Sequence, residues 1–146
     1  MIEKYDIKKI LNENEYSCVL LKDGNIIMTS FEKGIAPLYN YIKSYNQLTG
    51  GCIHLGDKII GRASAFLAIY LGVSYIYTNI ISETSLDILR RYNIEVEYER
   101  VVPYIENRKK DGQCPMEQSL EGIMDVNDGI STINEFILKR DKVKNI

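Results

Sequence analysis

The stretch VSYIYTNIISETSLDILRRYNIEVEYERV, residues 73–101, decides the fold that this sequence predicts. Residues 73–81 are apolar on both faces, which is typical of a strand inside a sheet. Ser82 is a good helix N-cap, and Asn93 tolerates the left-handed backbone that ends many helices. The last segment alternates polar and apolar residues, which places its acidic side chains on one wet face: Glu95, Glu97 and Glu99. The stretch therefore predicts a strand, a helix and a second strand in succession.

The segment just upstream, GDKIIGRASAFLAIYLG at residues 56–72, predicts another helix. Asp57 would cap its start, Gly72 would end it, and its apolar residues form one broad face. Residues 52–55, CIHL, are a short apolar run that predicts a strand or an extended entry to this helix. Strands that alternate with helices imply parallel pairing through right-handed crossovers.

The opening part of the chain predicts an antiparallel pair of strands. Asp23-Gly24 separates two β-rich runs, and this dipeptide favours a hairpin because both turn positions need a positive φ. We therefore expect strands at 16–22 and 25–30. A helix at 2–12 precedes them, and a short helix that begins near Pro37 follows them.

The order of elements predicts an α/β fold: a three-layer α/β/α sandwich whose mixed sheet opens with a β-hairpin. Further helices are expected from Pro115 and over residues 128–143. DVNDG at 125–129 is the one candidate boundary. We expect one domain over 1–125, and a C-terminal helical extension over 126–146 that packs on the same domain.

Composition excludes several classes of protein. A chain of 146 residues with 45% hydrophobic residues can bury a core without covalent staples. A net charge of −2 gives no strong nucleic-acid signal. The widely spaced Cys18, Cys52 and Cys114 contain no CxxC pair, so they favour neither a disulfide framework nor structural zinc. No signal peptide or membrane-spanning run is evident, which indicates a cytoplasmic protein. The composition also permits assembly into a homo-oligomer.

The start of the predicted helix at 57–72 is a first candidate site. It gathers residues suited to an anion or a phosphate: Asp57, Lys58, Gly61 and Arg62. Lys58 and Arg62 are four apart, hence on one helical face, beside backbone amides that have no intrahelical partner. The structural alternative is a capping Asp57, solvated cations and a glycine that permits close packing.

A second candidate is the SETS turn at 82–85, which follows a buried strand and so lies at the carboxyl end of the sheet. Ligands collect there in open α/β folds. Ser82 and Glu83 could bond to a polar ligand, or they could serve only as the N-cap and as a charge suited to the helix dipole.

The third candidate is NRKKDGQCPMEQ at 107–118. With Cys114 as N-cap and Pro115 next, Glu117 takes the third helical position, which resembles a capping box. Cysteine is a poor cap, and a helix start near a basic run lowers a thiol pKa, so Cys114 could be a nucleophile with Glu117 as proton acceptor and Lys58 nearby. A half-buried structural cysteine is the alternative. Asn107 and Arg108 are candidate ligand-binding residues of this loop.

Five blocks of the chain resemble a prokaryotic family of domains of unknown function, DUF1893: EKGIAPL, DKIIGRASAF, IISETSLDIL, VVPYIENR and DGQCPMEQ. The resemblance covers about residues 10–123. It implies a cytidine-deaminase-like fold and implies no established activity.

Deaminases of that fold carry H-x-E at one helix start and P-C-x-x-C at the next. The corresponding positions here, Asp57-Lys58 and Ser82-Glu83, contain neither histidine nor cysteine. Catalytic zinc needs three protein ligands, so we expect no metal, no cofactor and no zinc-dependent deamination. The hypotheses that follow are a small anionic or nucleotide-like ligand, a thiol enzyme using Cys114, and a non-catalytic module that oligomerises.

Overall fold

The computed structural model of the chain describes residues 1–48 and 50–144. Its centre is a five-stranded sheet with the strand order β2-β1-β3-β4-β5. β1 pairs antiparallel with β2 and β3, whereas β3, β4 and β5 are parallel. The predicted mixed sheet with an opening hairpin is therefore confirmed. The strands are β1 Cys18–Lys22, β2 Asn25–Ser30, β3 Ile53–Ile60, β4 Tyr75–Ser82 and β5 Glu95–Val102.

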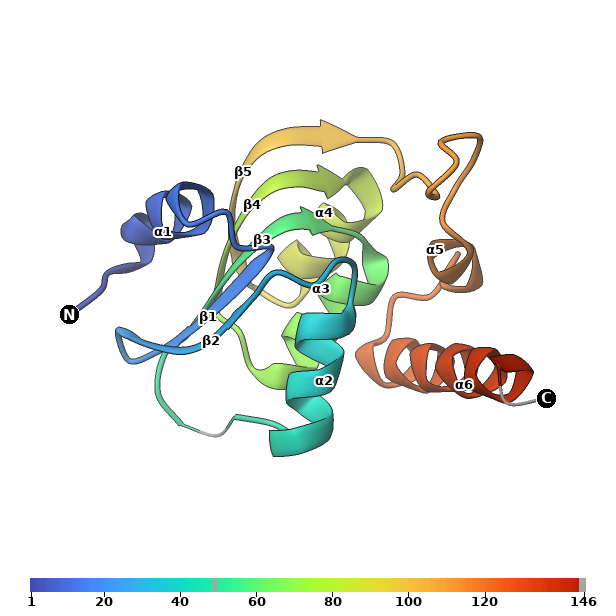
Figure 1. Cartoon of the computed structure of the whole chain (residues 1–146), viewed down its shortest axis with the longest axis horizontal. Coiled ribbons are helices and arrows are strands. Elements are labelled where there is room, and N and C mark those ends of the chain that lie inside the picture. Colours follow the sequence, from blue (N-terminus) through green and yellow to red (C-terminus); the bar gives the residue numbers. More distant parts are fainter. Residues whose placement is uncertain (49, 145–146) are drawn as a thin grey trace.

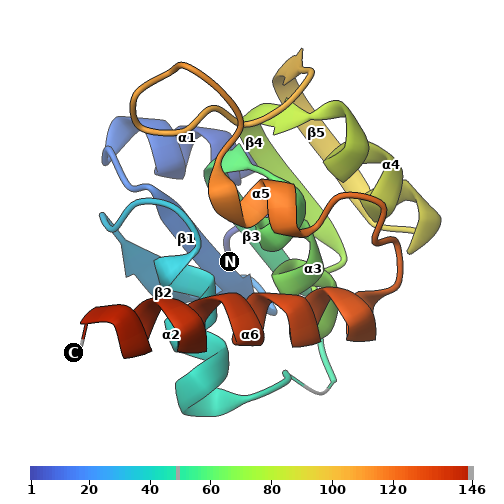
Figure 2. The same ribbon diagram turned by 90° about the vertical axis from the view of Figure 1, so that its right-hand side faces the viewer.

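Helices lie on both faces of this sheet (Figure 1). Helix α1 covers one face, and α2, α3, α4 and α6 gather on the other (Figures 1 and 2). A short 3-10 helix, Lys4–Asp6, leads into α1. The α-helices are α1 Ile7–Glu13, α2 Ala36–Tyr45, α3 Arg62–Leu71, α4 Glu83–Arg91, α5 Pro115–Ser119 and α6 Val126–Lys144.

The side chains of β1 show how the sheet divides the apolar core. Cys18 and Leu20 belong to the larger core cluster, which includes residues of α3 and α4. Val19 and Leu21 point the other way and join a smaller cluster with Ile7 of α1. This strict alternation follows from the period of a strand, and it explains why β1 is buried on both faces.

Local signals in the sequence decide where the elements end. Ser82 caps α4 by accepting a hydrogen bond from the Ser85 amide at 3.3 Å. Asn93 has φ 59° after that helix, as predicted. Gly72 has φ 100° and ends α3 in the left-handed conformation. Asp23 also has a positive φ in the hairpin turn, 49°.

The prediction that a helix begins at Asp57 is wrong. Residues 57–60 continue strand β3, and α3 begins only at Arg62, with Gly61 as its N-cap. The reason is tertiary: Asp57 lies between two neighbouring strands and pairs with Cys18 of β1 and Thr78 of β4. These ladders outweigh the local capping signal that Asp57 gives.

Strands β3 and β4 change direction near their carboxyl ends. Leu55 and Ile60 both belong to the larger core cluster, although they lie an odd number of positions apart in the strand. A regular strand would send them to opposite faces. The Ile59 amide donates to Asp57 Oδ1 at 3.3 Å, and Thr78 Oγ1 donates to the Ile80 carbonyl at 3.0 Å. These bonds between a side chain and the backbone two residues on mark a kink in both strands.

The kink turns consecutive residues away from the larger cluster. Asp57 is on the face of Cys18, and Ile60 is again in that cluster, so Lys58 and Ile59 both face the side of α1. The Lys58 ammonium accordingly reaches the Glu15 carbonyl just beyond α1, at 3.4 Å. Ile59 is 48% exposed. The Ile59 side chain is thus hydrophobic surface exposed to solvent near the carboxyl end of β3.

Helix α6 packs on α3. Ile133 and Ile137 are buried in the larger cluster, and a Cβ added to Gly129 would meet the Phe66 ring at 2.6 Å. The glycine therefore permits the close approach of the two helices. The expected extension over 126–146 includes residues 145–146, which lie outside the described residues. Within residues 1–48 and 50–144, no helix is long and apolar enough to span a membrane.

Asp57 makes the stability of the fold depend on pH. Its carboxyl is buried, and burial raises its pKa well above the ordinary value, although backbone amides oppose the shift. The contribution of Asp57 is present below the pKa of an unfolded aspartate and is lost as pH rises through the higher folded pKa. We expect Asp57→Asn, which imitates the neutral form, to raise Tm near neutral pH and to change it little near about pH 4.

Thermal unfolding of both proteins across this range measures the effect. Glu117, another buried carboxyl with a raised pKa, is present in both, so the difference between the curves isolates Asp57. A lower Tm of Asp57→Asn than of the original protein near neutral pH, which disappears toward about pH 4, would mean that the folded protein needs the charged carboxylate.

Candidate functional site

The start of α3 is closed by a carboxylate from a distant part of the chain. Glu117 of α5 accepts hydrogen bonds from the Arg62 amide at 2.5 Å and the Ala63 amide at 3.1 Å. The Arg62 guanidinium donates to the Glu117 carbonyl at 2.8 Å. Glu117 therefore caps α3 as an N-cap side chain does, although it lies 55 residues away from Arg62 in sequence.

Gly61 makes room for this carboxylate. A Cβ added at Gly61 would lie 2.5 Å from Glu117 Oε1, closer than any side chain tolerates. Glu117 is only 5% exposed, and burial raises its pKa, opposed by the Arg62 and Ala63 amides and by the Arg62 charge. Because Gly61 has no side chain, the Glu117 carboxylate can reach the start of α3.

The structure does not bring all residues of the predicted anion-binding site together. The structure brings Gly61 and Arg62 together, with the carboxylate of Glu117 in the place where we expected an external anion. Asp57 is buried in β3, 6% exposed. Lys58 faces the side of α1, so neither residue takes the helix-start position that the sequence predicted.

The predicted capping box at α5 is wrong. Cys114 is the N-cap residue of α5, but its side chain makes no capping hydrogen bond. Glu117 turns to α3 instead of to its own helix because the α3 amides lack other partners. Cys114 is half-buried and packs against the larger core cluster. Glu117 therefore bonds to the α3 amides, whereas the predicted proton transfer would need it beside the Cys114 thiol.

In the SETS turn, the structure shows the N-cap role that the sequence analysis gave as the structural alternative for Ser82. Ser82 is 3% exposed, and its hydroxyl lies 2.5 Å from that of Ser85, which is also buried. Glu83 is exposed in the first turn of α4. The described hydrogen bonds join neither Ser82 nor Cys114 to Lys58.

The loop between β5 and α5 folds back on itself as a small flap. Glu106 and Gln113 form an antiparallel bridge, and the Asn107 amide donates to the Gly112 carbonyl at 2.9 Å. Asn107 also donates through its side chain to Asp111 at 2.7 Å. Arg108, with Lys109 and Lys110, is exposed at the tip. The flap therefore presents basic side chains near the carboxyl ends of the strands.

A pocket of about 580 Å³ lies between this flap and the kinked strands. Its floor is apolar, with Ile59 and Ile80 turned outward by the kink. Arg100 of β5 and Lys110 of the flap supply positive charge, and Tyr104 supplies an exposed ring. Other lining residues are Val102, Pro103, Ile105, Glu106 and Asn107. Of the predicted ligand-binding residues, Asn107 alone lines this pocket.

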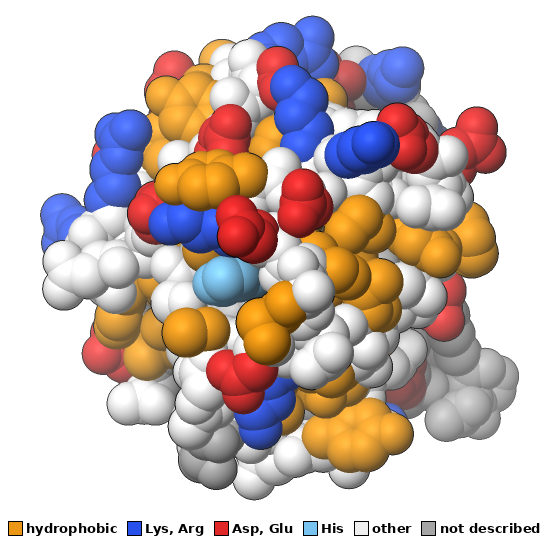
Figure 3. All heavy atoms as spheres, turned by 90° about the vertical axis from the view of Figure 1, so that its left-hand side faces the viewer, with side chains coloured by type: hydrophobic (Ala, Val, Ile, Leu, Met, Phe, Trp, Pro, Cys, Tyr) orange, Lys and Arg blue, Asp and Glu red, His pale blue; other side chains and the backbone are white. Residues whose placement is uncertain are grey.

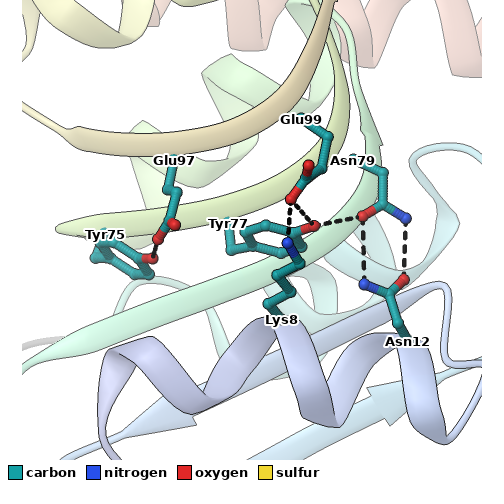
Figure 4. A network of polar contacts seen from close by, with 7 residues as sticks. All are labelled: Lys8, Asn12, Tyr75, Tyr77, Asn79, Glu97 and Glu99. Atoms are coloured by element: carbon teal, nitrogen blue, oxygen red, sulfur yellow. Dashed lines mark hydrogen bonds and ion pairs between the residues drawn. The ribbon is translucent and has the colours of Figure 1, made fainter.

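A polar network joins α1 to strands β4 and β5 (Figure 4). Asn79, next to Ile80, exchanges hydrogen bonds with Asn12 of α1, the shorter at 3.0 Å. The Tyr77 hydroxyl donates to Asn79 at 2.7 Å and also lies 3.2 Å from Glu99, the neighbour of Arg100. Sequence reasoning missed this network. The alternation of tyrosines and glutamates in β4 and β5 could have indicated it.

An exposed ion pair is part of the network. Glu99 accepts a hydrogen bond from Lys8 of α1. This bond lowers the pKa of Glu99 and raises the pKa of Lys8. Along the same strand Glu97 accepts from the Tyr75 hydroxyl at 2.6 Å, and burial raises the pKa of Tyr75. The space-filling view of this side shows acidic and basic side chains interspersed (Figure 3). Neither sign of charge dominates this face.

Metal ligation has no evident place in the described part of the chain. Residues 1–48 and 50–144 hold no group of three or more His, Cys, Asp or Glu side chains placed to bind an ion.

Comparison with known proteins now identifies the family. The family model named TM1506, domain of unknown function (DUF1893), matches residues 6–137, and the chain belongs to this family. The resemblance that its motifs indicated is thus confirmed. A crystal structure of a DUF1893 family protein, TM1506 from Thermotoga maritima, is similar with a TM-score of 0.80 and 22% identity. The similarity covers 95% of this chain and 92% of that one, and at this identity it shows the fold alone. The curated proteins offer no match.

The Glu117 cap predicts a specific pattern of stability. Glu117→Ala leaves the α3 amides without partners and should lower the free energy of unfolding by about 1–3 kcal/mol. Gly61→Ala should act on the same contact, because its methyl group displaces the carboxylate. The double variant should therefore lose clearly less than the sum of the single losses.

Urea unfolding monitored by circular dichroism measures these values. Glu135→Ala, which removes an exposed acid from α6, is the matched control and should change stability little. Strict additivity of Gly61→Ala and Glu117→Ala would contradict a shared contact.

Proposed function

We propose that this chain binds a small anionic or nucleotide-like ligand in the pocket between the flap and the kinked strands. The observation that carries the proposal is the pocket of about 580 Å³, which combines an apolar floor with Arg100 and Lys110. Ligand sites in proteins have this character: a mostly apolar lining with a few convergent polar groups.

The position within the sheet supports the same proposal. Ile59, Ile80 and Arg100 lie near the carboxyl ends of parallel strands, where open α/β folds collect their ligands. Arg100 and Lys110 supply the charge that an anion needs, and Tyr104 offers a ring against which a planar group can pack. Asn107 and Glu106 add an amide and an acid for polar recognition.

The alternative anion site at the start of α3 has less support, because Glu117 already accepts hydrogen bonds from the Arg62 and Ala63 amides. An external anion there would have to displace a buried carboxylate. This proposal replaces the ligand-binding roles first predicted for six residues and keeps that of Asn107. The six are Asp57, Lys58, Gly61, Arg62, Ser82 and Glu83. Arg108 at the flap tip can add charge at the rim.

The proposal includes finer features of the family resemblance. We place the chain among proteins of the cytidine-deaminase-like fold, as a three-layer sandwich whose domain runs to residue 125 with a C-terminal extension. It acts in the cytoplasm and without zinc chemistry. Histidine and cysteine are absent both from Asp57-Lys58, which lie in β3 just before α3, and from Ser82-Glu83 at the start of α4, and this absence supports the last point. Elemental analysis of the purified protein tests it, and stoichiometric zinc would contradict it.

A thiol reaction at Cys114 is not part of this proposal. Its proposed proton acceptor, Glu117, holds the α3 amides, and Lys58 bonds to the Glu15 carbonyl on the α1 side. The catalytic roles suggested for Cys114, Glu117 and Lys58 stay predictions from sequence.

Thermal-shift titration with nucleotides, sugar phosphates and inorganic phosphate tests the proposal. A ligand that binds only the folded protein raises Tm as its concentration rises. Arg100→Ala should weaken binding about tenfold or more, since a charge-assisted hydrogen bond contributes roughly 1.5–3 kcal/mol. Arg91→Ala, an exposed cation at the end of α4, is the matched control and should bind like the original protein. Equal losses in both variants, or a titration without response, would contradict the pocket.

A further inference from the structure

The two edges of the sheet differ in charge. Edge strand β5 carries Glu95, Glu97, Glu99 and Arg100. Edge strand β2, Asn25–Ser30, has the sequence NIIMTS and contains no charged residue. Natural proteins use charged side chains to stop an edge strand from pairing with another chain. β5 has this protection, and β2 lacks it.

Partners across the hairpin show which face each β2 side chain takes. Met28 pairs with Leu20 of the larger core cluster, whereas Thr29 pairs with Val19 on the α1 face. The register shifts between Leu20 and Leu21, so Ile26 pairs with Leu21 and returns to the α1 face. The bulge at Ile27 leaves Met28–Ser30 regular.

Exposed apolar side chains stand at both ends of this strand on the same face. Ile26 is 44% exposed and Phe31 is 70% exposed. Phe31 packs against Tyr16, with ring centroids 5.2 Å apart, and Tyr16 belongs to the rim of the α1-side cluster. Both side chains therefore offer hydrophobic surface beside an edge whose backbone groups have no further strand among the described residues.

The other face of the edge is hollow. A depression of about 230 Å³ separates β2 from helix α2 and is lined mainly by uncharged residues. Met28 and Ser30 contribute from the strand, and Pro37 and Tyr41 contribute from the helix. A strand added to β2 would thus find room for its side chains on this face.

We propose that a second copy of this chain occupies the edge, with the β2 strands paired antiparallel across a two-fold axis at Thr29. This register places Met28 opposite the partner's Ser30, and each pair lies on one face of the joined sheet. Because Ile27 is the bulged residue, Phe31 then meets the partner's Ile26 on the α1 face. The exposed apolar side chains at the ends of the strands become buried against each other.

Charge and symmetry favour a second copy over an unrelated partner. A two-fold axis pairs a strand with itself, so any charged residue at the axis would meet its own charge. β2 has none there, and Glu32 falls opposite the partner's Asn25 beyond the bulge in this register. The same operation on β5 would set glutamates close to glutamates. The proposal is independent of the ligand pocket, which β5 and the flap form at the opposite edge.

Sedimentation velocity of the full chain over a range of concentrations tests the proposal. We expect a dimer in the original protein and a dissociation constant at least about tenfold higher in Thr29→Lys, because like charges at the axis repel. Tyr98→Lys puts the same charge on the other edge strand, β5, and should leave the dimer intact. Monomer at every concentration in the original protein, or equal weakening by both variants, overturns the proposal.

Cross-linking gives a second readout that does not depend on a destabilising charge. In a Cys52→Ser background, which removes the exposed native thiol, Thr29→Cys should form an intermolecular disulfide under oxidation. Residues that face each other across an antiparallel pair have Cα atoms about 4.5–5.5 Å apart, within reach of a disulfide. Tyr98→Cys in the same background is the control. A yield from Thr29→Cys no greater than that of the control contradicts pairing at this edge.

Discussion

The buried carboxylate of Glu117 is the contact on which the arrangement of the molecule depends. It satisfies the Arg62 and Ala63 amides at the start of α3, and the Arg62 guanidinium returns a bond to the Glu117 carbonyl. A helix start buried without such partners would lose several hydrogen bonds. Because α5 follows the flap directly, this contact also anchors the far end of the flap, whose near end is the continuation of β5. The cap thus connects α5, beyond the flap, to helix α3.

The cap and the strand kink together decide where a ligand can bind. Glu117 fills the anion-binding position that helix α3 would otherwise offer. The kink at Asp57 and Thr78 turns Ile59 and Ile80 out of the core, and the anchored flap stands over them. One carboxylate therefore closes a site on the α3 side, while the kinked strands open a pocket on the α1 side. Membership of the DUF1893 family and the similarity to the Thermotoga maritima protein agree with this fold.

Local signals in the sequence predicted the fold well because they act over a few residues. The hairpin turn at Asp23, the N-cap at Ser82 and the left-handed Asn93 all fall where the pattern placed them. Asp57 misled because a capping signal was read without its strand neighbours, Cys18 and Thr78. The role of Glu117 could not be predicted, because its partner, the start of α3, lies far away in sequence. The pocket was missed for the same reason: it arises from a kink repeated in adjacent strands. Asn107 was the one predicted ligand-binding residue that lines it.

Amide NMR spectra during titration with inorganic phosphate and with a nucleoside monophosphate test the central claim most directly, since each amide reports on its own surroundings. The account predicts shifts at Ile59, Ile80 and the flap from Tyr104 to Asn107 as ligand is added, while the Arg62 and Ala63 amides stay unchanged behind Glu117. Saturable shifts confined to Arg62 and Ala63 would show that the start of α3 is open to an external anion, and would contradict the account.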